Sequence, residues 1–138
     1  MELSPYLIFD GDCETAFKRY EKVFDGKIVI LMRNADMPPG TPFPPGAEKR
    51  IMHVRLKIGD RTLMGSDALP GNFKKQQGFS VSLQTGSPTE ADRMFSELSE
   101  GGTVTMPIAE TFWAKRFGML TDKFGIHWIV NCDKDQAA

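Results

Sequence analysis

The chain contains two copies of one helix pattern. Three apolar residues at helical spacing, followed by a glycine, occur twice, and each member lies 75 residues from its counterpart: Ala16, Tyr20, Val23 and Gly26, then Ala91, Phe95, Leu98 and Gly101. Spacings of three and four residues place side chains on one face of a helix. Each copy lies between strand-like stretches, at 6–9 and 27–32 in the first half and at 79–83 and 103–108 in the second. A pattern repeated in this way predicts two similar supersecondary units.

The residues at the ends of both helices are also informative. Ser87–Glu90 has the order of a capping box, with Ser at the N-cap, Pro at the first helical position and Glu three residues after Ser. Asp12 can cap the first helix, and Glu14 lies in its first turn, where a negative charge is favourable. Gly26 and Gly101 predict where the two helices end.

Each helix is followed by a predicted hairpin, at residues 50–67 and 116–132. Between 52 and 58 the residue types alternate, with Met52, Val54, Leu56 and Ile58 on one face and His53, Arg55 and Lys57 on the other. In the second hairpin, Asp122–Gly125 suits a tight turn with Asp first and Gly last. Each half therefore predicts a strand, a helix and three strands. The predicted fold class is α+β, with two βαβββ modules at about 1–67 and 78–133 in a single domain of 138 residues.

Two stretches predict irregular structure. Residues 34–49 hold five of the nine prolines, which disfavour helices and central strands. A loop of this length in a compact domain is either a lid or binding loop, or a surface excursion, and both interpretations remain open. Residues 67–78 are polar and predict a link between the two halves.

The composition is typical of a soluble globular protein, with 41% hydrophobic and 25% charged residues. A net charge of −1 and scattered Lys and Arg residues argue against nucleic acid or a membrane surface as a partner. No apolar run approaches the roughly 20 residues that span a bilayer, and the first residues do not have the pattern of a signal peptide. These features predict a cytoplasmic protein. Cys13 and Cys132 form no metal-binding pair and predict two reduced, partly buried thiols.

Four segments resemble a known family: SPYLIFDG, the helix around residues 16–20, HVRLKIGD with LMGSD, and ETFWAKRFGMLTDKFGIHWIVN. Together they resemble the PhnB-like (YjdN-like) branch of the vicinal oxygen chelate superfamily over nearly the whole chain. This superfamily includes glyoxalases, bleomycin-resistance proteins and extradiol dioxygenases. The resemblance implies tandem βαβββ modules with curled mixed sheets, cavities between modules and a homodimer. Some PhnB-like sequences carry the label 3-demethylubiquinone 3-methyltransferase, but no glycine-rich loop between strand and helix is present to cradle a nucleotide cofactor.

The resemblance also implies where a metal would be bound. Enzymes of the superfamily hold a divalent metal with four side chains from the first and last strands of the modules. The corresponding positions here are Ser80, Ile129, Pro5 by the 75-residue offset, and a position near Met64. Hard metal ions need carboxylate oxygens and imidazole nitrogens, which these residues lack. The sequence therefore predicts no metal and no cofactor.

The remaining candidates for ligand binding are His53, Met64, Glu110, Phe112, Trp113, His127 and Ile129. If Ile129 faces a cavity, strand alternation places His127 and Asn131 on the same side, and Trp128 and Val130 in the core. His127 would then move a proton, bind an anion, or be an ordinary solvated side chain.

The other candidates are equally open to two interpretations. His53 shares a face with Arg55 and Lys57, which forms either a basic lining for an anionic ligand or an ordinary wet sheet face. Glu110 lies beside Phe112 and Trp113 and could clasp a cationic or flat ligand. Alternatively, the two aromatic residues fill a barrel mouth or a dimer interface.

The leading functional hypothesis is a metal-free protein that binds a small apolar or aromatic molecule and could act by sequestering it. The ligand would lie against Phe112, Trp113, Met64 and Ile129, and Glu110, His53 or His127 would provide polar selection. The alternative is an enzyme of unassigned reaction that uses Glu110 or His127 as acid or base. A third possibility is a structural module whose cavity is filled by side chains. No catalytic residue is assigned.

Overall fold

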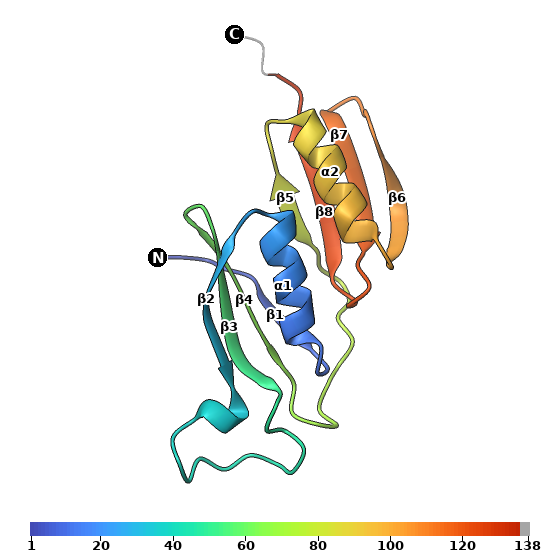
Figure 1. Ribbon diagram of the computed structural model, residues 1–138. Helices are drawn as coiled ribbons and strands as arrows, with labels where there is room; N and C mark the ends of the chain where they lie inside the picture. The colour runs from blue at the N-terminus through green and yellow to red at the C-terminus, as the bar shows by residue number, and fades with distance from the viewer. Residues whose placement is uncertain (136–138) are drawn as a thin grey trace. The chain divides into compact units, whose positions relative to one another are not determined.

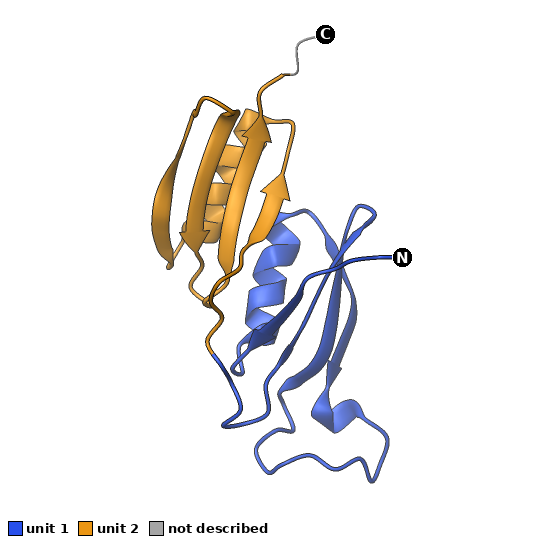
Figure 2. Ribbon diagram, turned by 180° about the vertical axis from the view of Figure 1, so that it is seen from behind, with its two compact units in different colours: residues 1–74 blue, residues 75–138 orange. Residues whose placement is uncertain are grey.

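Figure 1 shows the computed structural model, which describes residues 1–135. The chain divides into two compact units, unit 1 (residues 1–74) and unit 2 (from residue 75), which are coloured separately in Figure 2. Unit 1 contains β1 (Tyr6–Phe9), α1 (Cys13–Val23), β2 (Lys27–Arg33), the 3-10 helix η1 (Asn34–Asp36), β3 (Ile51–Ile58) and β4 (Arg61–Asp67). Unit 2 contains β5 (Val81–Gln84), α2 (Pro88–Ser99), β6 (Thr103–Ala109), β7 (Ala114–Thr121) and β8 (His127–Asp133). The predicted α+β fold with two βαβββ modules is confirmed.

The four strands of each unit form one open mixed sheet. The strand orders are β1-β4-β3-β2 and β5-β8-β7-β6. The first strand of each unit runs parallel to the last, and the other pairs are antiparallel. A parallel pair requires a crossover, and the helix that supplies it lies against one face of its own sheet (Figure 1).

The core of each unit lies between the helix and the sheet. In unit 1, α1 buries Phe17, and in unit 2, α2 buries Phe95. A glycine in the facing strand allows each ring to approach closely. A Cβ atom added to Gly65 would lie 2.7 Å from the Phe17 ring, and one added to Gly118 would lie 2.6 Å from the Phe95 ring. Both helices therefore pack on a strand position that has no room for a side chain.

The start of α2 is close to the prediction. Ser87 is the N-cap, and its hydroxyl oxygen accepts a hydrogen bond from the backbone N–H of Glu90 at 3.1 Å. The reciprocal bond of the capping box is absent, because the Ser87 N–H donates to the hydroxyl oxygen of Thr85 and Glu90 is paired with Arg93. The predicted box is therefore half formed.

The predicted cap of α1 is wrong. Asp12 occupies the N-cap position, but its side chain makes no capping hydrogen bond. The carboxylate of Asp67, at the end of β4, takes over this role and accepts from the N–H groups of Gly11 and Cys13. Its second oxygen accepts from the N–H of Ile51. A buried carboxylate from a distant strand therefore satisfies the donors that a local cap would serve.

The two helices also end differently. Gly101 has a φ of +76° and follows α2 in the left-handed conformation predicted for a glycine stop. After α1, the left-handed residue is Asp25, with a φ of +50°. Gly26 is required for a different reason, because a Cβ there would lie 2.6 Å from the carbonyl oxygen of Lys57.

The proline-rich loop begins with regular structure. Residues 34–36 form η1, contrary to the prediction, because the prolines begin only at residue 38. The rest of the loop up to β3 contains no helix or strand. Asn34 is buried and its side-chain amide donates to the carbonyl oxygen of Ala47 at 2.8 Å, while its N–H donates to the carbonyl oxygen of Arg50. These bonds fix the base of the loop.

Candidate functional site

In each unit, the sheet face opposite the helix carries half-exposed side chains, and we call it the open face. Strand register places Tyr6, Ile8, His53, Arg55, Lys57, Met64 and Ser66 on the open face of unit 1. It places Ser82, Gln84, Phe117, Met119, Thr121, His127, Ile129 and Asn131 on the open face of unit 2. Intervening residues such as Leu56 and Val130 are buried against the helix. The predicted alternation in β3 is confirmed.

His53 and Met64 lie together on the open face of unit 1. The Nδ1 atom of His53 is 3.2 Å from the hydroxyl oxygen of Tyr6, and the two rings are stacked with centroids 5.8 Å apart. Met64 pairs with Tyr6 on one side and with Arg55 on the other. Tyr6 was not selected from the sequence, although alternation with buried Leu7 places it on this face.

The open face of unit 2 carries three aromatic side chains in edge-to-face contact, which we call the aromatic ladder: Phe112, Trp113 and Phe117. Ring centroids are 4.8 Å apart between Phe112 and Trp113 and 5.2 Å apart between Trp113 and Phe117. The hydroxyl oxygen of Thr111 accepts from the N–H groups of Trp113 and Ala114 and so orders the turn that presents them. Phe112 is 88% exposed and Trp113 46% exposed, so neither fills the core of unit 2.

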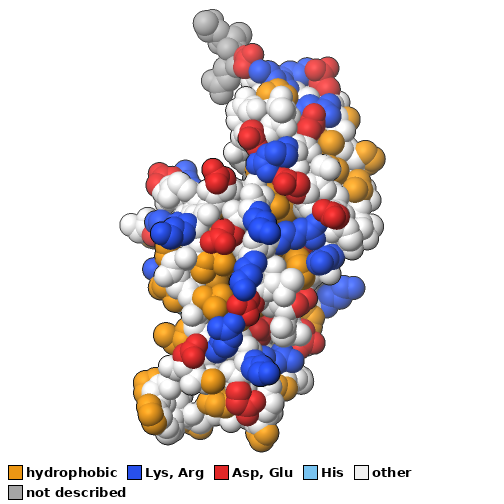
Figure 3. All heavy atoms as spheres, in the orientation of Figure 1, with side chains coloured by type: hydrophobic (Ala, Val, Ile, Leu, Met, Phe, Trp, Pro, Cys, Tyr) orange, Lys and Arg blue, Asp and Glu red, His pale blue; other side chains and the backbone are white. Residues whose placement is uncertain are grey.

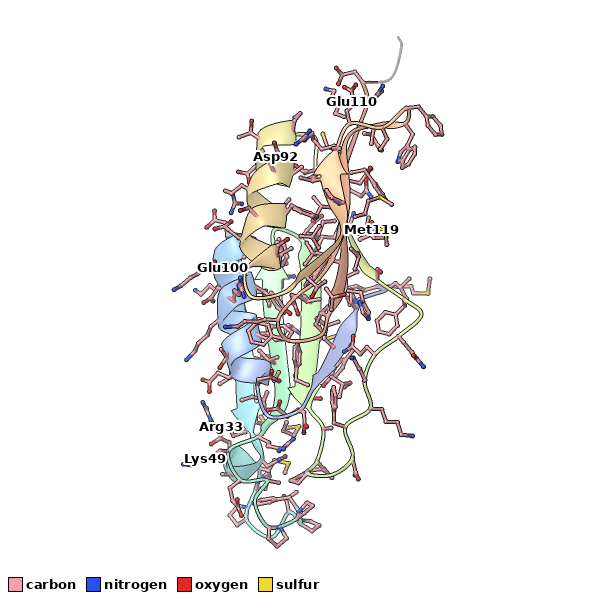
Figure 4. The ribbon with its side chains drawn as sticks, turned by 90° about the vertical axis from the view of Figure 1, so that its right-hand side faces the viewer. Arg33, Lys49, Asp92, Glu100, Glu110 and Met119 are labelled. Atoms are coloured by element: carbon pink, nitrogen blue, oxygen red, sulfur yellow. The ribbon has the colours of Figure 1, made fainter. Side chains whose placement is uncertain are left out.

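Glu110 lies directly after β6, at the end of the sheet (Figure 4). Its side chain is exposed and makes no hydrogen bond or ion pair with the residues that the structure describes. Met119 lies on the open face of unit 2, on the side of the sheet opposite α2 (Figure 4), and pairs with Ile129. Glu110, Phe112 and Trp113 therefore belong to the loop between β6 and β7, whereas Phe117 lies in β7 and Ile129 in β8.

His127 has both ring nitrogens engaged. Nε2 lies 3.2 Å from the carbonyl oxygen of Gln76, which can only accept, so we assign the proton of the neutral ring to Nε2. Nδ1 then accepts from the hydroxyl of Thr121 at 2.8 Å. Either bond would have to break before this imidazole could exchange a proton with a ligand.

The predicted distinction between neighbouring residues of β8 holds. Trp128 is 1% exposed and Val130 is fully buried on the helix side, as predicted for core residues. The indole N–H of Trp128 donates to the buried carboxylate of Asp122 at 2.9 Å. Ile129 is half-buried on the opposite side, next to Ser82 and Met119.

The 75-residue offset relates the starts of the helices and the bounds of the first strands, but within the strands it does not relate residues on the same face. Tyr6 lies on the open face, whereas Val81, its counterpart by that offset, pairs with the buried Trp128 and faces α2. Side chains alternate along a strand, so open-face counterparts must differ by an even offset. Assigning Pro5 as the counterpart of Ser80 is therefore wrong.

The described residues contain no group of three or more His, Cys, Asp or Glu side chains that could hold a metal ion. Met64 and Ile129, two of the positions assigned by the resemblance, offer only thioether and aliphatic groups. These side chains do not suit a hard divalent cation. The absence of a metal in the functional protein stays a prediction.

A hollow of about 480 Å³ lies elsewhere in unit 2, between α2 and β6. It is lined by Asp92, Phe95, Ser96, Glu97, Ser99, Glu100 and Ile108, and Figure 4 shows Asp92 and Glu100 on α2. Asp92 is paired with Arg116, and Glu97 with Arg93. None of the predicted ligand-binding residues lines this hollow, so it is distinct from the open face.

Neither cysteine is suited to act as a nucleophile. Cys13 and Cys132 are both free and buried, as predicted. Burial raises the pKa of the Cys13 thiol far above its ordinary value, and the nearby charge of Asp67 adds to this effect. A thiol kept protonated in this way is unreactive.

Charged side chains are interspersed on the face shown in Figure 3, where basic and acidic groups alternate over short distances. Oppositely charged side chains of the fold form ion pairs such as Lys18 with Glu14 and Arg50 with Asp10. This distribution agrees with the scattered basic residues noted in the sequence.

Known proteins match the chain along almost its whole length. A family model described as 3-demethylubiquinone-9 3-methyltransferase matches residues 1–131. The chain belongs to this family, the PhnB-like branch of the vicinal oxygen chelate superfamily. The resemblance found in the sequence is therefore confirmed, and the fold of this PhnB-like protein is that of the superfamily.

Three relatives show how extensive the match is. The YjdN protein of Escherichia coli (strain K12) is 34% identical over 147 residues, covering 99% of this chain and 98% of YjdN. The crystal structure of protein PA1353 from Pseudomonas aeruginosa is 42% identical, with a TM-score of 0.89 and coverage of 98% of this chain and 99% of that chain. A Bacillus cereus structure described as a putative 3-demethylubiquinone-9 3-methyltransferase, PhnB protein, is 25% identical, with a TM-score of 0.79 and coverage of 96% and 99%.

The two helices of this PhnB-like protein are too short or too polar to cross a bilayer. Within residues 1–135, neither α1 nor α2 combines the length and the hydropathy of a membrane-spanning helix.

Proposed function

We propose that this PhnB-like chain is a cytoplasmic protein that binds a small apolar or aromatic molecule on its open faces, without a metal. The aromatic ladder carries this proposal. Phe112 and Trp113 remain largely exposed although they are held in an ordered edge-to-face arrangement. Large rings presented in this way provide apolar area for a flat ligand at a low cost in side-chain entropy.

Unit 1 supports the proposal with a second, smaller surface. Tyr6 is 43% exposed and stacks on His53, with Met64 beside it. Tyr and His combine an apolar ring with a polar tip, and Met adapts to irregular shapes. Such a surface can provide polar selection next to apolar contact.

We also propose that two copies of the chain associate. The edge strands carry exposed apolar side chains, Val29 (48%) and Ile30 (37%) on β2 and Val104 and Met106 (44% each) on β6. Exposed apolar groups on a sheet edge favour pairing with another chain. Sedimentation velocity is expected to show a species of twice the chain mass of 15.4 kDa. A single species at the chain mass across micromolar concentrations would reject the dimer.

A ligand screen tests the binding proposal. We expect flat apolar compounds to raise the thermal unfolding temperature of the protein and to shift NMR signals of residues in the aromatic ladder. Trp113→Ala should abolish binding. Leu3→Ala is the control and should not affect binding, because Leu3 is 97% exposed and its substitution removes apolar area outside the aromatic ladder. The proposal is rejected if Trp113→Ala binds the same compounds as the unmodified protein.

Mass spectrometry of the recovered ligands separates binding from the enzyme alternative. Compounds recovered unchanged support a binding protein. Conversion that disappears in Glu110→Gln or His127→Gln would establish catalysis by that residue instead. Because both His127 nitrogens are already hydrogen-bonded, we expect no turnover that depends on it.

A further inference from the structure

The side chain of Asn131 in β8 has a buried acceptor without a partner. Asn131 is 7% exposed, and its Nδ2 donates to Oε1 of Gln84 at 2.8 Å and to Oδ1 of Asp133 at 2.7 Å. Its Oδ1 accepts no hydrogen bond from the described part of the chain. The Asp133 carboxylate can only accept, so the amide orientation is fixed by its partners. Buried polar atoms are nearly always satisfied in native proteins, so this exception needs an explanation.

The unsatisfied acceptor lies next to the aromatic ladder. Asn131 is paired with Phe117 on one neighbouring strand and with Gln84 on the other, all on the open face of unit 2. The ring of Phe117 contacts Trp113, which is 46% exposed. A ring stacked on the ladder would therefore have its edge within reach of Asn131.

Unit 1 provides its own donor at the carboxyl ends of its parallel strands. The Nη1 atom of Arg50 donates to Oδ1 of Asp10 and to the carbonyl oxygen of Ala68, each at 2.9 Å. Asp10 and Ala68 directly follow β1 and β4. In unit 2, no described side chain donates to Asn131 Oδ1 near the carboxyl ends of β5 and β8. Among the described residues, Oδ1 of Asn131 therefore lacks a donor of the kind that Arg50 provides at the strand ends of unit 1.

We propose that Oδ1 of Asn131 accepts a hydrogen bond from the bound ligand, and that the ligand is a planar aryl cation with N–H donors, such as an arylamidine. The inference rests on the proposed function, because it places the aryl ring on the aromatic ladder. The carboxylate of Asp133, which accepts from Nδ2 of the same amide, favours a positive charge nearby. Since Oδ1 is buried, neighbouring side chains must move for the ligand to reach it.

The test compares two probes on the full chain. Benzamidine has an aryl ring and charged N–H donors, whereas methyl benzoate has a similar ring and no donor. We expect Asn131→Ala to weaken benzamidine binding about tenfold or more and to leave methyl benzoate binding unchanged. Asn131→Ser keeps a smaller oxygen acceptor without adding a charge beside Asp133, so it should retain part of the benzamidine binding. In the unmodified protein, benzamidine should shift the NMR signals of the Asn131 side-chain amide.

The outcomes separate this inference from the proposed function. Trp113→Ala should weaken the binding of both probes. If Asn131→Ala binds benzamidine normally while Trp113→Ala loses both probes, the role of Asn131 is overturned and the binding surface stands. If neither probe binds the unmodified protein at millimolar concentration, both ideas fail. Circular dichroism of each variant confirms folding, and Asn131→Ser serves as the second variant if the alanine form unfolds.

Discussion

Both units bury a carboxylate, but Asp67 of unit 1 holds distant segments together, whereas Asp122 of unit 2 holds a single hairpin. Asp67 accepts from the N–H groups of Gly11 at 2.8 Å, Cys13 at 3.1 Å and Ile51 at 2.8 Å. The first two partners lie 56 and 54 residues away along the chain. One side chain therefore joins the end of β4 to the start of α1 and the start of β3.

The contacts of Asp122 are local. Its Oδ1 accepts from the N–H groups of Phe124 at 2.9 Å and Ile126 at 3.0 Å, and its Oδ2 accepts from the indole of Trp128. The carbonyl oxygen of Asp122 also accepts from the N–H of Gly125, which confirms the predicted tight turn. All of these partners lie within six residues of Asp122.

The difference shows that the two modules share a framework of strands and a helix but not the polar groups that stabilise it. In unit 1, the carboxylate acts only when three segments have come together. In unit 2, it acts as soon as one hairpin forms. We expect the loss of Asp67 to destabilise a whole unit, and the loss of Asp122 to act mainly through one turn and one buried indole.

The largest effect is expected for Asp67→Ala. The substitution leaves three backbone donors without an acceptor, and those of Cys13 and Ile51 are buried. We expect a loss of about 4 kcal/mol in the free energy of unfolding of unit 1. Pulsed alkylation in denaturant measures this by unit, because Cys13 lies in unit 1, Cys132 lies in unit 2, and both are fully buried.

The control for this experiment is Asp67→Asn. Asn keeps the oxygen that serves Gly11 and Cys13 but turns an amide toward the N–H of Ile51, so the loss should be intermediate. Burial raises the pKa of the Cys13 thiol, so alkylation reports opening of the unit rather than reactivity of the native thiol. If the substitution shifted the denaturant dependence of alkylation equally for Cys13 and Cys132, the idea that Asp67 acts on unit 1 would be contradicted.

This comparison also explains what the sequence can predict. Helix spacing, the Asp122 turn and the core position of Trp128 depend on neighbours within a few residues, so the pattern carries the information. The role of Asp67 depends on partners more than 50 residues away, and local rules assigned the cap to Asp12 instead. The spacing of residues within one segment does not predict long-range polar contacts.

The candidate site was predictable to a similar extent. Alternation placed His127, Ile129 and Asn131 on one face, because strand geometry is local. The contact of Tyr6 with His53 and the unsatisfied acceptor of Asn131 depend on register between strands. The offset error at Pro5 has the same origin, since β1 and β5 keep the 75-residue offset in their bounds, but the face that each residue presents depends on pairing with β4 or β8.

The second largest effect is expected for Asp122→Ala, with a loss of about 3 kcal/mol in the stability of unit 2. The buried indole N–H of Trp128 would lose its acceptor, and so would the N–H groups of Phe124 and Ile126, the second of which is buried. Trp128→Phe removes the indole donor, so the double variant should lose about 1–2 kcal/mol less than the sum of the single changes. Tryptophan emission follows unit 2 specifically, because both Trp113 and Trp128 lie there. Additive losses would show that the indole contact carries no coupling.

A matched pair of smaller effects compares the helix contacts of the units. Gly65→Ala and Gly118→Ala each place a methyl group within 3 Å of a phenylalanine ring, Phe17 or Phe95, and of backbone atoms. We expect each to cost about 1–3 kcal/mol in its own unit through overpacking. Both losses of stability can be measured by denaturant unfolding, with hydrogen exchange of peptides from each unit as the readout. A neutral result at either glycine would mean that the helix of that unit can shift outward.

The smallest effect concerns the ion pairs that tie each helix to a strand, Glu14 with Arg33 at 2.6 Å and Asp92 with Arg116 at 2.7 Å. Hydrogen bonds from Arg33 and then Lys18 lower the pKa of Glu14 below its ordinary value of 4.5. A lowered pKa means that the stabilisation is present above that value and is lost as the pH falls through the folded-state pKa. Glu14→Gln should therefore cost about 0.5 kcal/mol near neutral pH and progressively less in acid, measured by urea unfolding at several pH values.

Asp92→Asn is the matched control in unit 2 and should leave the stability of unit 1 unchanged across the same series. A Glu14→Gln cost that stays constant into acid would show that packing of the side chain, not its charge, holds α1 to β2.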